Sequence, residues 1–215
     1  MGNPTLDVTW AVEWLRKSAA VVAENRMALI ELDRVIGDGD HGENLDRGFT
    51  AILEKLDAEP PATPGAAFKL AAMALMSKVG GAAGPLYGTA FLRAATTLGD
   101  ASELDAPALA AALGAARDGV VARGKAEVGE KTMIDAWTPA VDAAAAAAAS
   151  GMGPAELLDA AATAAEAGAV STDPLIARKG RASYLGERAI GHRDPGAASS
   201  ALILRAAAQA AGVNA

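Results

Sequence analysis

The sequence contains no cysteine, few aromatic residues and fewer basic than acidic residues. Without cysteine there are no disulfides, thiolate zinc sites or cysteine nucleophiles, and this composition fits a reducing compartment. The 19 Lys and Arg against 26 Asp and Glu give a net charge of −7. General nucleic-acid binding and membrane-surface binding both need a basic face. We therefore expect neither a nucleic acid nor a membrane as a partner.

Long apolar runs and an N-terminal targeting pattern are also missing. The alanine run at 143–149 is far shorter than the roughly 18 to 20 strongly apolar residues of a transmembrane helix. The first residues, Met-Gly-Asn-Pro-Thr-Leu-Asp, have neither the basic region nor the apolar run of a signal peptide. These features predict a cytoplasmic protein.

The apolar content is instead rich in small residues. Hydrophobic residues make up 52% of the 215 residues, aromatic residues only 4%, and alanine dominates. Alanine is the strongest helix former, and no strand-like alternation is visible, so we predict an all-α fold of about eight helices in a single domain, 1–215. We expect helices at 9–36, 44–56, 66–79, 86–97, 105–122, 132–149, 155–167 and 197–211. The first of these is two helices, or one with an irregularity near Asn25, and the proline-rich segment 59–65 is too short to divide the chain.

Two tryptophans mark the first helix as part of the core. Trp10 and Trp14 stand four residues apart and therefore share one helical face. We predict that they anchor the core rather than form a platform for a ligand.

The segment 33–48 concentrates unusual chemistry. Asp33, Asp38 and Asp40 are followed by His41 and Asn44, with glycine at 37, 39 and 42. Such a density of carboxylates is repulsive without a cation, and oxygen ligands suit a hard ion such as Mg²⁺. The glycines permit positive φ, and the following helix presents an N-terminus that attracts anions. The alternative interpretation is a solvated Asp/Gly turn.

Three further loops break the helical pattern. The segment 80–88 is glycine-rich and feeds a helix, with Pro85 in a favoured first-turn position, although its glycines also suit close helix packing. The segment 123–133 carries charges and two glycines, and its alternative is a solvated connection. The segment 177–196 concentrates Arg178, Lys179 and Arg181, as an anion contact requires, unless these form a basic helix face. We predict that the four loops meet at one end of a helical bundle.

Taken together, the four loops resemble the nucleotide-binding L subunit of bacterial dihydroxyacetone kinase, the DhaL family, over essentially the whole chain. The matching segments are Leu-Asp-Arg at 32–34, Ile-Gly-Asp-Gly-Asp-His-Gly-Glu-Asn at 36–44, Arg-Gly-Phe at 47–49, Gly-Gly-Ala-Ala-Gly-Pro-Leu-Tyr-Gly at 80–88, Arg-Gly-Lys-Ala-Glu at 123–127, Lys-Thr-Met at 131–133 and the segment 177–196. The resemblance implies a closed up-and-down barrel of eight antiparallel helices. It also implies that ADP or ATP and two Mg²⁺ ions are bound by the loops at one end.

The resemblance assigns roles residue by residue. The three metal-bridging aspartates correspond to Asp33, Asp38 and Asp40. The nucleotide contacts correspond to His41, Gly42, Glu43, Asn44, Ala82, Ala83, Gly124, Met133, Arg181, Asp194, Pro195 and Gly196. The chain departs from the common pattern at Ala83, where many members have serine, and at Glu130, where many have aspartate. The first departure puts a phosphate hydroxyl contact in doubt, whereas a backbone contact survives.

The resemblance also implies partners. The family's K subunit binds dihydroxyacetone covalently through a histidine, whereas both histidines of this chain, His41 and His192, lie in nucleotide motifs. We therefore expect no acceptor-binding residue here, a chain that is monomeric by itself, and an acceptor site on a K subunit. In this family, L subunits that are chains of their own typically keep ADP bound. A phosphohistidine protein, the M subunit of the phosphotransferase system, recharges this ADP. The alternatives are an ATP-dependent kinase of dihydroxyacetone or another small ketose, and a non-catalytic ADP-binding regulator that contacts a transcription factor.

Overall fold

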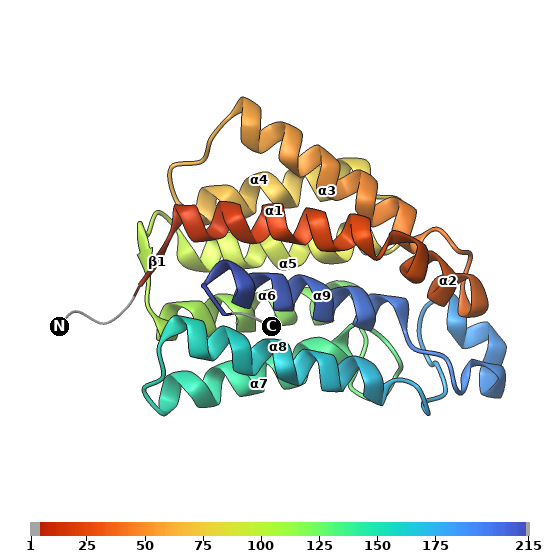
Figure 1. Cartoon of the computed structure of the whole chain (residues 1–215). Coiled ribbons are helices and arrows are strands. Elements are labelled where there is room, and N and C mark those ends of the chain that lie inside the picture. The colour runs from red at the N-terminus through yellow and green to blue at the C-terminus, as the bar shows by residue number, and fades with distance from the viewer. Residues whose placement is uncertain (1–4, 214–215) are drawn as a thin grey trace.

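The structure is a computed structural model that describes residues 5–213, and it consists almost entirely of helices (Figure 1). The α-helices are α1 (Val8–Glu24), α2 (Arg26–Ile36), α3 (His41–Ala58), α4 (Pro64–Lys78), α5 (Ala83–Leu98), α6 (Ala106–Gly124), α7 (Ile134–Ala149), α8 (Pro154–Ser171) and α9 (Pro195–Ala210). A 3₁₀ segment, η1 (Arg181–Ala189), lies between α8 and α9. The predicted all-α class is confirmed.

Eight of these helices form a closed ring. Following the packed neighbours gives the order α1, α3, α4, α5, α6, α7, α8 and α9, and α9 packs back against α1. The red α1 and the blue α9 accordingly lie side by side in Figure 1. The shorter α2 lies at one end of the ring, where it contacts α3, α9 and η1. This is the predicted eight-helix up-and-down barrel, with α2 added as a cap.

One small element was not expected. A two-residue strand, β1 (Leu6–Asp7), pairs antiparallel with β2 (Glu103–Leu104), with Leu6 opposite Leu104. The pair ties the start of the chain to the connection between α5 and α6. Strands of two residues carry too little alternation to be recognised in a sequence.

Several helix boundaries follow from local capping. The predicted irregularity near Asn25 is the break between α1 and α2. Asp7 Oδ1 accepts the N–H of Thr9 at 2.8 Å, and Asp105 Oδ1 accepts that of Ala108 at 2.9 Å. Each side chain satisfies a donor that has no partner within its helix.

Two helices start three residues earlier than predicted. The predicted starts at residues 44 and 86 become His41 for α3 and Ala83 for α5. Glycines of both segments were expected to shape loops, with close helix packing as the alternative for 80–88, and Gly42 and Gly84 lie inside the helices. A Cβ at Gly84 would collide with the carbonyl oxygen of Val79, so this glycine permits close packing at the cost of helix propensity.

The tryptophans anchor the core as predicted. Trp10 and Trp14 are each 4% exposed and pack edge-on against Phe68. Their indole N–H groups donate to the carbonyls of Ala207 at 3.1 Å and Ile203 at 2.8 Å. These bonds satisfy the polar edge of each buried ring and fix α1 against α9, which closes the barrel.

The remaining core is built largely from alanine. The alanine-rich helices α7 and α8 pack against each other through small side chains, including buried Ala144, Ala147, Ala161 and Ala165. Small residues let helix backbones approach closely. Within the described range, 5–213, no helix is both long enough and apolar enough to cross a bilayer.

Candidate functional site

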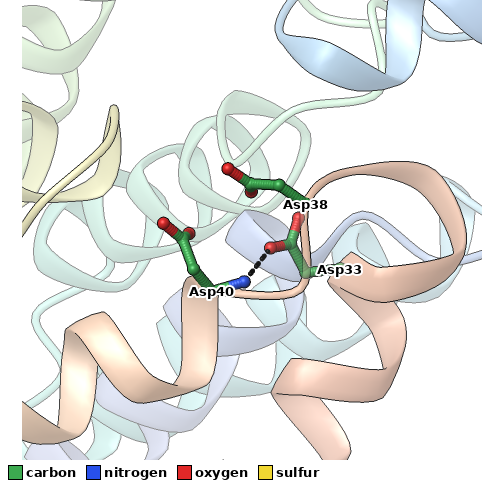
Figure 2. A group of neighbouring side chains, drawn as sticks. All are labelled: Asp33, Asp38 and Asp40. Carbon is green, nitrogen blue, oxygen red and sulfur yellow. Dashed lines mark hydrogen bonds between the residues drawn. The ribbon is translucent and has the colours of Figure 1, made fainter.

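Three carboxylates meet at the end of the barrel capped by α2. Asp33 lies in the last turns of α2, Asp38 in the connecting turn, and Asp40 at the N-cap position of α3. One oxygen from each carboxylate lies within 4.8 Å of the others (Figure 2). Asp33 Oδ2 also accepts the N–H groups of Asp40 at 2.9 Å and His41 at 3.1 Å. The cluster is therefore held by the backbone of the turn itself.

The glycines of the turn have separate functions. Gly39 has φ of +77°, a conformation that side chains with a Cβ rarely adopt. Gly37 has a negative φ of −141°, and a Cβ there would collide with the Asp33 carboxylate. Gly39 therefore makes the turn possible, and Gly37 leaves room for the Asp33 carboxylate.

The electrostatics of the cluster favour a cation. Burial raises the pKa of Asp33, the N–H bonds from His41 and Asp40 oppose this increase, and the charges of Asp38 and Asp40 add to it. Asp38 pairs with the Arg181 guanidinium at 2.8 Å. Three hard oxygen donors in one small volume fit a cation such as Mg²⁺.

A cavity of about 470 Å³ opens beside these carboxylates. This volume is typical of small-molecule sites. Of the residues assigned from the sequence, its lining includes Asp33, Asp38, Asp40, His41, Asn44, Ala82, Ala83, Gly124, Met133, Arg181, Asp194, Pro195 and Gly196. Apolar side chains of α5, α6 and α7, namely Leu86, Val120 and Ile134, complete part of the wall. All four unusual loops therefore contribute to one cavity.

Gly42 and Glu43 are not among the residues that line this cavity. Glu43 pairs with Arg26 at 3.2 Å, and a Cβ at Gly42 would collide with the Arg26 carbonyl oxygen. Both residues therefore pack α3 against α2. Their N–H groups belong to the first turn of α3, where helix donors lack partners within the helix, and nucleotide contact at these two positions stays a prediction.

We expect Gly42→Ala to lower stability by about 1 to 3 kcal/mol, because the added methyl forces α3 away from α2. The measurement is urea unfolding followed by circular dichroism. Gly114→Ala in α6 is the matched control, since its Cβ would meet only Val141 at 3.9 Å, and there we expect about 0.5 to 1 kcal/mol of stabilisation. Equal effects at both positions would contradict the packing role of Gly42.

A buried hydrogen-bond network that was not predicted from the sequence supports the cavity. The Tyr87 hydroxyl lies 2.7 Å from Ser199 Oγ and 2.8 Å from Ser200 Oγ. Trp137 donates to Ser200 Oγ at 3.1 Å, and His41 Nε2 lies 2.9 Å from Ser199 Oγ. The network joins α3, α5, α7 and α9. No sequence spacing indicates it, because two of its bonded members, His41 and Ser199, lie 158 residues apart.

The network also changes what His41 can do. Burial lowers the pKa of His41 to about 4, with the Pro195 carbonyl acting in the opposite direction. The ring is therefore neutral near pH 7, and one of its nitrogens is engaged by Ser199. His192, the other histidine, is not in the lining of the cavity.

Buried Lys131 and partly buried Asp194 also line the cavity. Lys131 is 1% exposed and lies in the connection between α6 and α7, a position that the sequence analysis included in a motif but gave no role. Burial raises the pKa of Asp194 to about 7, reinforced by Asp135 and Asp33 and opposed by the Ala197 N–H and by Lys131. The two positions that depart from the family pattern are Glu130 and Ala83. Glu130 accepts the Glu127 N–H at 2.9 Å, and Ala83 is the first residue of α5.

Comparison with known proteins agrees with this geometry. Residues 35–209 match the family model described as the DAK2 domain. The chain is 45% identical to the ADP-binding subunit DhaL of PEP-dependent dihydroxyacetone kinase 1 from Listeria innocua, over 95% of this chain and 98% of that protein. It is 44% identical to the corresponding ADP-binding subunit DhaL from Escherichia coli, over 96% and 99% of the two chains.

A solved structure shows the same fold. The dihydroxyacetone kinase from C. freundii, in complex with AMP-PNP and Mg²⁺, superposes with a TM-score of 0.66 and 28% sequence identity. The match covers 94% of this chain but only 33% of that kinase, so the chain spans about a third of the larger protein. Sequence, fold and cavity lead to the same conclusion: the chain belongs to the DAK2 domain family.

Proposed function

We propose that this chain is the ADP-binding subunit of a PEP-dependent dihydroxyacetone kinase. The observation that supports this best is the cavity that all four unusual loops line, with three carboxylates at its edge. The relatives that the chain matches over nearly their full length are named as such subunits. The proposed reaction moves a phosphoryl group from the bound nucleotide to dihydroxyacetone held on another subunit.

The topology of the barrel favours a phosphate ligand. In an up-and-down barrel every second helix starts at the same end, and residues at or beside the starts of α3, α5, α7 and α9 line the cavity. A helix N-terminus carries a partial positive charge and free N–H groups. Four of them at one cavity favour an anion there, although the net charge of the chain is negative.

Within this cavity we assign the ligand's parts to separate residues. Asp33, Asp38 and Asp40 would hold two Mg²⁺ ions, which would supply positive charge to neutralise the phosphate oxygens. The first turns of α3 (His41 to Asn44), α5 (Ala82 and Ala83) and α9 (Asp194 to Gly196), together with Arg181, would bind the phosphates. At Ala83 the contact would come from the N–H group, because a methyl side chain has no hydroxyl. Gly124 and Met133 would lie against the ribose and the adenine.

The acceptor would be supplied by a partner. The His41 ring is hydrogen-bonded to Ser199 through Nε2, and His192 lies outside the cavity lining, so neither is assigned to hold a sugar. We therefore propose a K subunit as the partner that carries dihydroxyacetone, and an M subunit with a phosphohistidine as the donor that recharges ADP. We further propose a regulatory contact with a transcription factor, a monomeric state of the isolated chain and a cytoplasmic location. The cytoplasmic location fits the lack of cysteine.

We call this scheme, in which a phosphohistidine protein recharges the bound ADP, the relay. It requires the nucleotide to stay bound to the protein, which gives a direct test. We expect the protein to purify with ADP, and we expect isotope-labelled ADP to remain on the protein through many turnovers with the phosphohistidine donor and the K subunit. Slow release is physically reasonable, because two divalent ions and several N–H donors must release one diphosphate together. The measurement is the label retained after a chase with unlabelled ATP.

The outcomes separate two kinds of kinase subunit. Retained label supports the relay. Loss of the label within the first few turnovers would mean that the chain is a subunit of an ATP-consuming kinase, in which ADP leaves in every cycle. A protein that binds no nucleotide at all would contradict the proposed function itself.

A further inference from the structure

Lys131 is a buried lysine whose charge has a structural use. Its side chain is 1% exposed, and its Nζ donates to the carbonyl oxygens of Thr172 at 2.6 Å and Asp173 at 3.3 Å. Both carbonyls lie just beyond the C-terminus of α8, where a cation is favourable. Lysine is rarely buried unless it is paired, so the position of this one needs an explanation.

The backbone at Lys131 is also unusual. Its φ is +61°, in the left-handed region that residues other than glycine seldom adopt. The neighbouring Asp135 carboxylate accepts the N–H groups of Gly129 at 2.5 Å and Thr132 at 2.8 Å, which fixes the loop in this form. The loop therefore directs the lysine inward, toward α8.

Lys131 connects two segments that form different walls of the cavity. Its own loop leads directly into Met133, on the proposed adenine side. On the other side, Thr172 Oγ1 accepts the Asp194 N–H at 3.0 Å, and Asp194 starts the α9 turn on the proposed phosphate side. Asp173 adds a two-bond ion pair with Arg193, at 3.0 and 2.9 Å.

We propose that Lys131 is a positioning residue for the nucleotide: it holds the Met133 loop and the Asp194 turn at a fixed separation, so that the base end and the phosphate end bind at the same time. The inference rests on the proposed nucleotide site. Its Nζ lies on main-chain carbonyls and not on the aspartate cluster, so it acts through the walls of the cavity. Removing its charge weakens nucleotide binding and leaves the metal ligands in place.

The central experiment compares Lys131→Met with the wild-type protein. Methionine keeps most of the length of the side chain and removes its charge and its N–H donors. We expect the Kd for ADP at saturating Mg²⁺, measured by calorimetry, to rise at least about tenfold. Mn²⁺ binding without nucleotide, measured by electron paramagnetic resonance, stays within about twofold. At saturating ADP the rate of phosphoryl transfer also stays within about twofold of the wild-type rate. The variant therefore needs a higher ADP concentration but transfers the phosphoryl group at the same rate.

Arg205→Met is the matched control. Arg205 joins α8 to α9 through Glu166 at 2.7 Å and Thr163 at 3.0 Å, and it is not in the cavity lining. We expect this variant to lose thermal stability while keeping the wild-type ADP affinity. If Lys131→Met behaves in the same way, Lys131 has only a structural role and the inference is overturned.

A second variant keeps the test valid if Lys131→Met does not fold. Thr172→Val keeps the shape of a buried side chain and removes the acceptor of the Asp194 N–H, so we expect the Kd for ADP to rise a few-fold. In hydrogen exchange, the Asp194 amide of this variant exchanges faster than that of the wild-type protein. Unchanged affinity in Thr172→Val overturns the inference. A wild-type protein that binds no ADP overturns the proposed function instead.

Discussion

Asp38→Asn and Asp40→Asn are each expected to abolish phosphoryl transfer and to leave the helical content unchanged. Asparagine keeps the size of the side chain but removes the charge that binds a divalent ion. Both carboxylates are exposed at the cavity edge, so the core is undisturbed. We expect the single-turnover rate with the K subunit to fall by at least about 10²- to 10³-fold, that is about 3 to 4 kcal/mol of lost transition-state stabilisation. Circular dichroism checks the fold.

Asp57→Asn is the control for this prediction. Asp57 lies at the far end of α3 and pairs with Arg16 at 2.6 Å, with both side chains largely exposed. Exposed pairs contribute little, so we expect wild-type transfer and nearly wild-type stability. Transfer rates within a few-fold of wild type in Asp38→Asn or Asp40→Asn would refute the metal assignment.

Asp33→Asn should behave differently from its two neighbours. Asp33 is 8% exposed, and its Oδ2 accepts the N–H groups of Asp40 and His41. Its replacement therefore disturbs the turn as well as the charge. A combined loss of activity and stability is expected here, which makes this variant less informative about the metal alone.

Mg²⁺ and ADP together are expected to raise the thermal stability of the protein well above either ligand alone. Without Mg²⁺, the negative charges of a diphosphate in the cavity would be repelled by the carboxylates of Asp33, Asp38 and Asp40. Bound Mg²⁺ removes this repulsion, so each ligand strengthens the binding of the other. A ligand at about 100 times its Kd stabilises the folded state by about 2.7 kcal/mol. For a chain of this size we therefore expect an increase in Tm of about 5 to 10 °C with both ligands.

Two controls identify the origin of this effect. Adenosine with Mg²⁺ lacks the diphosphate and should give no joint stabilisation. Asp38→Asn should lose most of the joint effect while keeping the melting temperature of the ligand-free protein. The same melting temperature in all four conditions, without ligand, with each ligand and with both, would remove the claim of a nucleotide site.

The fold class could be predicted because helix formation is largely a local property. Alanine content, apolar spacing and the break at Asn25 act over a few residues, and these predictions are confirmed by the structure. The aspartate cluster was also predictable, since Asp33, Asp38 and Asp40 lie within eight residues of sequence, and a turn of this length brings them together. Local patterns and the four motifs were sufficient for the family, the barrel and most of the cavity lining.

The glycines show where local interpretation fails. Gly42 and Gly84 were expected in loops, with close helix packing as the alternative for Gly84, and both lie in helices. Their function is to leave space for the Arg26 and Val79 carbonyls, which depends on how the barrel packs. Tertiary packing overrides propensity at these positions.

The supporting contacts of the site were decided only by the tertiary structure. Lys131 bonds to a carbonyl 41 residues away because α7 packs against α8. His41 meets a serine 158 residues away because the ring closes between α9 and α1. Buried polar groups must find partners wherever the fold brings them, and no periodicity in the chain encodes those partners. Local sequence patterns therefore indicate most of the residues that line the cavity, whereas the packing of the helices determines which buried side chains hold them in place.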